Sequence, residues 1–461
     1  MEKKVFLLFV GISFIFSCYA DSTEERIQQL EILYQKQKEK LEVLQKNILE
    51  EETYKQYTNR IVEQYLRESV TQDDKTAITA GYEKGFFLRS AEGNLDFKFT
   101  GYIQTGFGLF ENDTFDNNSF NFNAIFFTFD TYLYKDWHVR IQMDLANTNG
   151  YRFGGGTYNL GLRDAYIEYT AIPEFSIRAG QTFVPFSMQG QYPTSEFMTI
   201  MPDPFIRSWG AGRDTGIFVY GVIENMFSYK AGIFNGEGLN RTNVSDDMML
   251  AGEMRFYYCG YKENSKSFFH IGFLRNRSED ITNISLISSW TRRIFPNTVT
   301  QHGRTEGWRT SADAGFRMDL ALPEEHSLRV ESEFMYSTWE RDLATGRRSY
   351  LDGYGFLFQF VYRHCFNPKI KGSGLIGGFA FSYTDLDNDS TDSMAANNNI
   401  PGQRIFSYTF ILGYALSRHI RFAFNWVILD LDEKTFYGTS KDNGKAGGLE
   451  NAWLIQLTAL W

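Results

Sequence analysis

The stretch NAWLIQLTALW, residues 451–461, has the period of two that is typical of a β-strand. Every second residue from Trp453 to Trp461 is apolar, whereas Gln456 and Thr458 lie on the opposite face. A chain end is usually polar and frayed unless something holds it. The alternation therefore predicts a strand whose apolar face meets lipid and whose other face meets water.

The same alternation recurs from about residue 93 to the last residue. In WHVRIQMDL, residues 137–145, apolar residues alternate with His, Arg, Gln and Asp. The pattern predicts sixteen strands, which begin near Phe97, Phe122, Trp137, Leu160, Phe175, Thr215, Phe227, Met248, Phe268, Arg309, Leu328, Tyr350, Gly374, Phe406, Ile420 and Trp453.

The connections between these strands alternate between long and short. Long connections include residues 184–214 and 276–308, and short ones include YKDW, PEEHS and LSRH. Short turns on one side and long loops on the other are typical of an outer-membrane barrel. Strands in lipid must pair all their backbone groups, so the sheet must close. We therefore predict an all-β transmembrane barrel of about 16 antiparallel strands over residues 95–461. The alternatives are a large β-sandwich or a propeller, and the repeat of roughly 40–50 residues that a propeller needs is not found.

The composition agrees with this fold class. Aromatic residues make up 17% of the chain, and the mean hydropathy of −0.35 excludes a helical membrane bundle. The net charge of −10 argues against a nucleic-acid partner. The three cysteines, Cys18, Cys259 and Cys365, form no disulfide framework and no metal-ligand pattern, so we expect no metal site and no cofactor.

The first 94 residues divide into three expected segments. Residues 1–20 have the charged start, apolar core and small residues of a cleaved signal peptide; the alternative is a lipidated Cys18. Residues 21–75 follow a 3–4 apolar spacing with Gln37 as a polar position, which predicts a periplasmic α-helical coiled coil. A lone amphipathic helix remains the alternative, and the spacing does not decide between dimer and trimer. Residues 76–94 are expected to form a linker.

The third long connection, residues 182–214, is the strongest candidate for a functional loop. It contains four of the nine prolines together with Phe, Met, Ile, Tyr and Trp, so we expect it to pack against other parts of the protein. It either folds into the barrel and narrows the pore or packs on the rim. The pore and constriction residues expected from strand parity and from this loop are Arg140, Arg178, Arg207 and Arg213, with Asp144 and Glu168 as counter-charges. A competing interpretation is that these charges only pair with each other across strands.

No catalytic motif occurs in the sequence. The six histidines lie outside any HExxH or GxSxG context. We therefore expect no enzyme, and an enzymatic alternative would depend on His302, which lies well inside a long outer loop.

Three stretches resemble the phosphate-selective porin O and P family. They are GLRDAYIEYTAIPEFSIRAGQTFVPFS at residues 161–187, RDTGIFVYG at residues 213–221 and the aromatic final strand. The resemblance implies a sixteen-stranded trimeric porin whose anion pathway is lined by Arg and Lys. Phe183 stands where the family commonly has a lysine.

These observations together predict an outer-membrane porin of the Gram-negative type. It would let small hydrophilic solutes diffuse passively, with a preference for phosphate-like anions. Its expected partners are outer-membrane lipid, two further copies in a homotrimer, peptidoglycan and the barrel assembly machinery, which would recognise the strand ending at Trp461. The alternative function is a structural tether that links the barrel to the cell wall through the coiled coil.

Overall fold

The computed structural model describes residues 78–111, 118–146, 161–193, 199–200, 210–243, 246–258, 267–281, 305–342, 348–366, 370, 372–385, 404–431 and 449–461, and Lys38 among the first 77 residues. The chain divides into two units, residues 1–77 and residues 78–461. The expected signal peptide and coiled coil therefore lie outside the described residues, apart from Lys38 in the coiled coil, and both stay predictions. No helix in the described part of the chain is long and apolar enough to cross a membrane.

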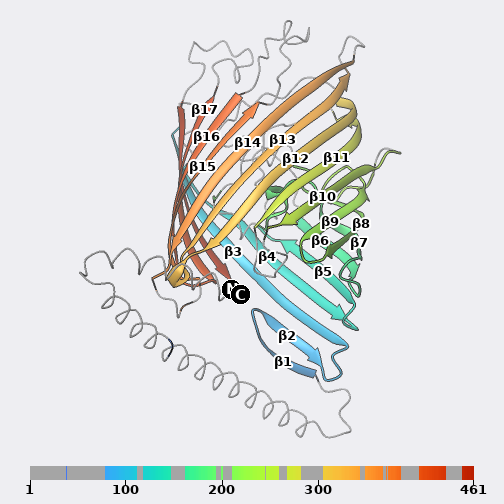
Figure 1. The fold of residues 1–461 in the computed structure, drawn as a ribbon, viewed down its shortest axis with the longest axis vertical. Helices are drawn as coiled ribbons and strands as arrows, with labels where there is room; N and C mark the ends of the chain where they lie inside the picture. The colour runs from blue at the N-terminus through green and yellow to red at the C-terminus, as the bar shows by residue number, and fades with distance from the viewer. Residues whose placement is uncertain are drawn as a thin grey trace, which may run out of the picture. The chain divides into compact units, whose positions relative to one another are not determined.

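The described part of residues 95–461 contains sixteen antiparallel strands that close into a barrel (Figure 1). Each strand pairs with the next along the chain, and β18 pairs with β3 from Leu460↔Tyr102 to Asn451↔Glu111. The strands are β3 (Leu95–Glu111), β4 (Ser119–Leu133), β5 (Trp137–Asp144), β6 (Gly161–Tyr169), β7 (Ser176–Phe183), β8 (Arg213–Ile223), β9 (Phe227–Phe234), β10 (Met249–Tyr257), β11 (Phe268–Ile281), β12 (Thr305–Ala321), β13 (Ser327–Asp342), β14 (Arg348–His364), β15 (Gly374–Asp385), β16 (Arg404–Ala415), β17 (Ile420–Leu431) and β18 (Leu449–Leu460). The predicted barrel and its strand number are confirmed.

Two further strands precede the barrel and were not predicted. β1 (Ile78–Tyr82) and β2 (Phe86–Ser90) form an antiparallel hairpin within the segment that was expected to be a linker. β2 pairs with the start of β3, from Phe86↔Phe99 to Arg89↔Asp96. The hairpin thus extends the sheet beyond the end of β18.

The connections alternate between short turns at one end of the barrel and longer segments at the other. The turn between β4 and β5 has two consecutive residues with positive φ, Tyr134 and Lys135, and the turn between β8 and β9 has Glu224 and Asn225. Two successive positive φ values match the right-handed twist of the flanking strands, which permits tight hairpins. Two 3₁₀ turns, η1 (Gln189–Gln191) and η2 (Pro323–Glu325), complete the described regular structure.

Side chains alternate between the lumen and the outer surface along each strand. In β18, Gln456 and Thr458 are buried inside the barrel, whereas Ile455 is exposed on the outside. Outward aromatic rings pair at the end with the short turns, as in Trp137 with Tyr169 at 5.0 Å. Aromatic rings of this kind suit the level of lipid headgroups. The predicted orientation of the last strand is confirmed.

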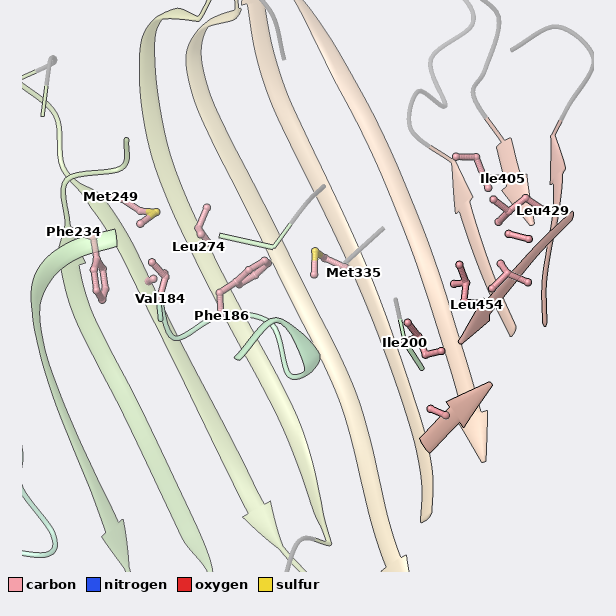
Figure 2. Close-up of a cluster of buried hydrophobic side chains, with 14 of the residues drawn as sticks. Val184, Phe186, Ile200, Phe234, Met249, Leu274, Met335, Ile405, Leu429 and Leu454 are labelled. Atoms are coloured by element: carbon pink, nitrogen blue, oxygen red, sulfur yellow. The ribbon is translucent and has the colours of Figure 1, made fainter. Parts of the chain in front are cut away.

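An apolar cluster lies inside the barrel, where an open channel would hold only water. Its members come from the connection after β7 and from the inner faces of several strands (Figure 2). They are Val184, Phe186, Ile200, Phe218, Phe234, Met249, Ala251, Leu274, Met335, Ile405, Ala423, Val427, Leu429, Ala452 and Leu454. The cluster shows that this connection fills part of the lumen.

Candidate functional site: the lumen and its third loop

The third loop connects β7 and β8, residues 184–212, and its first described part, residues 184–193, lies inside the barrel. Val184, Phe186 and Met188 alternate along VPFSM and are all fully or almost fully buried. Burying a side chain of this size stabilises a structure by about 1.5–3 kcal/mol relative to leaving it in water. These apolar residues therefore pack against the inner wall of the barrel. Of the two predicted positions, inside the barrel or on its rim, the described start of the loop takes the first.

A buried carboxylate on β13 holds the start of this loop. Glu333 accepts hydrogen bonds from Ser187 Oγ at 2.6 Å, Met188 N at 2.9 Å and Gln189 N at 2.9 Å. These donors satisfy backbone groups of the loop that would otherwise be buried without partners. Glu333 therefore fixes the path of residues 187–189 across the inner wall.

Neighbouring wall residues add further bonds to the loop. Glu331 accepts hydrogen bonds from Gln189 Nε2 at 3.2 Å and from the Tyr192 hydroxyl at 3.3 Å. Burial raises the pKa of Tyr192 well above its usual value, so this hydroxyl keeps its proton and remains a donor. Gln191 is also bound to the wall, because Lys230 Nζ on β9 donates a hydrogen bond to Gln191 Oε1 at 2.9 Å.

A second described part of the loop, residues 199–200, lies at the wall on β17. The backbone N–H of Ile200 donates to Asn425 Oδ1 on β17 at 2.5 Å. The loop thus contacts both β13 and β17, which are separated by three strands along the wall. A segment that joins two distant parts of the wall narrows the passage between them.

Five of the six predicted pore residues form ion pairs at the lumen wall. Arg178 contacts Glu168 at 2.6 Å, as two of the predicted residues should if they are counter-charges. Arg140 instead pairs with Asp130 through two bonds, of 2.7 and 3.1 Å, and Asp130 was not predicted. Asp130 lies in the sequence IFFTFDTYL, where the period of two would have placed it in the lumen.

The other two described candidates have partners that were also not expected. Arg213 donates to Asp164 Oδ1 at 2.6 Å, and its guanidinium lies 3.5 Å from the centre of the Phe183 ring. Asp144 pairs with Arg163 at 3.4 Å. Arg207 lies outside the described residues.

Similar ion pairs continue around the wall from β5 to β13. Lys230 contacts Glu253 at 2.6 Å, and Arg317 contacts Glu331 at 3.4 Å. Strand registers place these residues opposite each other, as in Glu168↔Arg178, Lys230↔Glu253 and Arg317↔Glu331. We call the basic members of this row the lumenal cation row; they are Arg140, Arg178, Lys230, Arg255, Arg317 and Arg329.

Within most of these pairs the cation is the more exposed partner. The exposed fraction is 34% for Arg140 against 8% for Asp130, 22% for Arg178 against 7% for Glu168, and 33% for Lys230 against 2% for Glu253. The order is reversed only near the short turns, where Arg317 is 2% and Asp319 25% exposed. The acids are packed against the wall, so the water in this part of the lumen meets mainly guanidinium and ammonium groups.

Two of the described histidines are buried and bonded to neighbouring wall or loop residues. His138 lies between Asp130 at 2.7 Å and Glu168 at 2.6 Å, and the fully buried His270 donates to the Phe186 carbonyl at 2.8 Å. His302 lies outside the described residues. Among the described residues, no group of His, Cys, Asp and Glu is arranged to hold a metal ion.

Comparisons with known proteins agree with this geometry. An anion-selective porin from Comamonas acidovorans superposes with a TM-score of 0.51 at 11% identity, over 80% of this chain and 100% of that chain. A loop L8 deletion mutant of OmpT, an outer membrane protein of Vibrio cholerae, gives a TM-score of 0.51 at 10% identity, over 80% and 100%. At such low identity these likenesses show the fold.

No curated protein sequence matches the chain. The model of the family described as phosphate-selective porin O and P matches residues 97–258, from β3 to the turn after β10. This region contains the two central stretches on which the resemblance was based, together with four of the six residues of the lumenal cation row. The resemblance is thereby confirmed over these residues: they match the model of the phosphate-selective porin O and P family, and the chain has the barrel fold seen in the Comamonas acidovorans porin.

Proposed function

We propose that the protein is an outer-membrane channel through which small hydrophilic solutes diffuse passively, with a preference for anions. The anion preference is inferred from side-chain exposure. Arg140, Arg178 and Lys230 are each more exposed than the acidic residue with which they pair. Rings of exposed cations favour anions in water-filled pores. The Comamonas acidovorans porin is anion-selective, which agrees with this proposal.

The third loop sets the size limit of the channel in this proposal. Its contacts with Glu333 on one side and Asn425 on the other keep it inside the lumen. A fixed loop excludes large solutes by size alone and needs no conformational change. Transport is then passive and driven only by the solute gradient. The fold and family are those of channels, and the tether alternative receives no support from either.

The assembly that we propose is a homotrimer, as the family resemblance implies. The N-terminal segment, residues 21–75, is proposed as a coiled coil on the periplasmic side, where three copies of the helix would suit a trimer. It would also reach toward the cell wall. Peptidoglycan and the assembly machinery remain proposed partners, the latter through the strand that ends at Trp461.

Liposome swelling tests the channel directly. Purified protein is reconstituted into vesicles, and the swelling rate is measured in isosmotic solutions of neutral sugars of increasing size. We expect rates that fall steeply with sugar size and that are faster for a small organic anion than for a cation of equal size. Vesicles that do not swell in any solute would contradict the channel, and equal rates for anion and cation would contradict the preference.

A further inference from the structure

The hairpin β1–β2 has one apolar and one polar face. Directly paired residues in antiparallel strands point to the same side. The registers Tyr82↔Phe86 and Phe86↔Phe99 therefore place these three rings on one side of the sheet. This face of the hairpin carries Ile78, Ala80, Tyr82, Phe86 and Leu88, with Ser90 opposite Ile78 as its one polar residue.

This apolar face is strongly exposed. The exposed fraction is 63% for Ile78, 55% for Tyr82 and 56% for Phe86. Exposed apolar side chains that cluster on one face usually mark a surface that contacts a membrane or another protein. The described part of the chain does not cover this face.

The opposite face of the hairpin is polar. Arg89 donates to Asp96 at 2.9 Å and to Glu83 at 3.3 Å, and its guanidinium lies 4.4 Å from the centre of the Phe87 ring. These groups point to the same side as the lumenal residues of β3, because Arg89 pairs with Asp96 and Phe87 with Lys98. The hairpin therefore keeps the inside-polar, outside-apolar division of the barrel wall.

The apolar face is continuous with the outer surface of the barrel. Phe86 and Leu88 pair with Phe99 and Phe97 on the outer side of β3. Phe99 in turn packs on Phe129 of β4 at 5.1 Å. The hairpin thus adds two short strands to the sheet beside the end of β3 (Figure 1). Its apolar face continues the outer aromatic surface of the barrel.

The position of the hairpin in the sheet fixes its depth. β18 pairs with β3 from Tyr102 onward, and the last residue, Trp461, exchanges hydrogen bonds with Gly101 at 3.0 and 3.2 Å. Before Gly101 in the sequence, β2 pairs with the same edge of β3, from Phe99 to Asp96. β1 pairs with no strand other than β2 in the described chain, so the backbone groups of its outer edge need water or headgroups. At the membrane–water interface, the outer edge of β1 can hydrogen-bond to water and headgroups while the apolar face contacts acyl chains.

We propose that the apolar face of the hairpin binds the phospholipid leaflet at the short-turn end of the barrel, with acyl chains and glycerol backbones covering Ile78, Tyr82, Phe86 and Leu88. The proposal rests on the barrel being embedded in a membrane, as the proposed function requires. The hairpin then extends the wall over the part of β3 that β18 does not reach.

Site-specific photocrosslinking tests this proposal in the full-length protein. Photoreactive p-benzoylphenylalanine replaces Phe86, its neighbour Phe87 on the polar face, or Phe269, which is exposed on the outer side of β11. Each variant is reconstituted into vesicles of phosphatidylethanolamine and phosphatidylglycerol and irradiated. Mass spectrometry then measures the yield of phospholipid adducts, and gel electrophoresis detects crosslinks between protein chains.

We expect similar phospholipid yields at Phe86 and Phe269 and a several-fold lower yield at Phe87. A protein adduct in place of the lipid adduct at Phe86 would overturn the proposal, whether the partner is a second copy or the N-terminal segment of the same chain. Equally low lipid yields at Phe86 and Phe87, with a high yield at Phe269, would overturn it as well. A low yield at Phe269 too would overturn the membrane location of the barrel, and with it the proposed function.

Discussion

Replacing Glu333 by glutamine should loosen the third loop without disturbing the barrel. The carboxylate accepts three hydrogen bonds, from Ser187 Oγ, Met188 N and Gln189 N. The Ser187 and Met188 donors share Oε1, whereas the Gln189 N–H is bonded to Oε2. A glutamine side chain has one oxygen, so at least one donor must face its NH₂ group instead.

The magnitude follows from these contacts. Leaving a buried donor without its acceptor costs about 1–3 kcal/mol, so the loss of one bond shifts the balance between docked and released loop by about 5- to 100-fold. The strand pairs of β13 with β12 and β14 do not involve the Glu333 side chain. The barrel should therefore fold normally while residues 187–189 detach more often from the wall.

Single-channel recording is the appropriate assay, supported by hydrogen exchange of the Met188 and Gln189 amides. In Glu333→Gln we expect greater open-channel current noise, a higher mean conductance and faster exchange of both amides. Asp385→Asn is the matched control, because Asp385 is equally buried but bonds to Tyr383 and Arg404 on β15 and β16. Wild-type noise and wild-type exchange in Glu333→Gln would refute the role of Glu333 as the anchor of the loop.

Three further predictions concern the wall, the last residue and the N-terminal segment. Replacing Arg178 by glutamine should lower the anion-to-cation permeability ratio several-fold, whereas Arg418→Gln in an exposed turn should leave it unchanged; equal ratios in both variants would count against the lumenal cation row. Deleting Trp461 removes its two bonds to Gly101 and its ring contact with Phe127, so heat-resistant folded barrel in outer-membrane fractions should fall more than the conductance of the channels that remain; unchanged barrel levels would contradict a role in assembly. Removing residues 22–75 should preserve the conductance of reconstituted protein, and its complete loss would contradict a channel formed by the barrel alone.

The strands were predictable because the membrane imposes a single rule on all of them. Each must alternate between lipid and lumen, so the period of two is visible in one strand at a time, as in the segment that starts at Trp137. Strand starts consequently agree closely, and the largest differences, such as Arg309 expected and Thr305 observed, lie at the long-loop end. The hairpin β1–β2 was missed because its strands are only 5 residues each, too short for the period to be recognised.

The pairing of charges was harder to predict than their orientation. Period two correctly puts Arg140, Arg178 and Glu168 inside the barrel, but the partner of each depends on the register between strands. Arg178 meets Glu168 because β6 and β7 are joined by a short turn that fixes their register. The bond between Ser187 and Glu333 joins residues far apart in the sequence and depends on how the third loop folds, which no local pattern contains.

The reversal potential of the purified channel in a planar bilayer, measured under a gradient of KCl, tests the central claim most directly. A lumen whose exposed groups are mainly Arg140, Arg178 and Lys230 should pass chloride more readily than potassium. We predict a potential of the sign set by anion flow, and its size should shrink as salt screens the lumenal cations. A potential of the opposite sign, set by potassium, would contradict it.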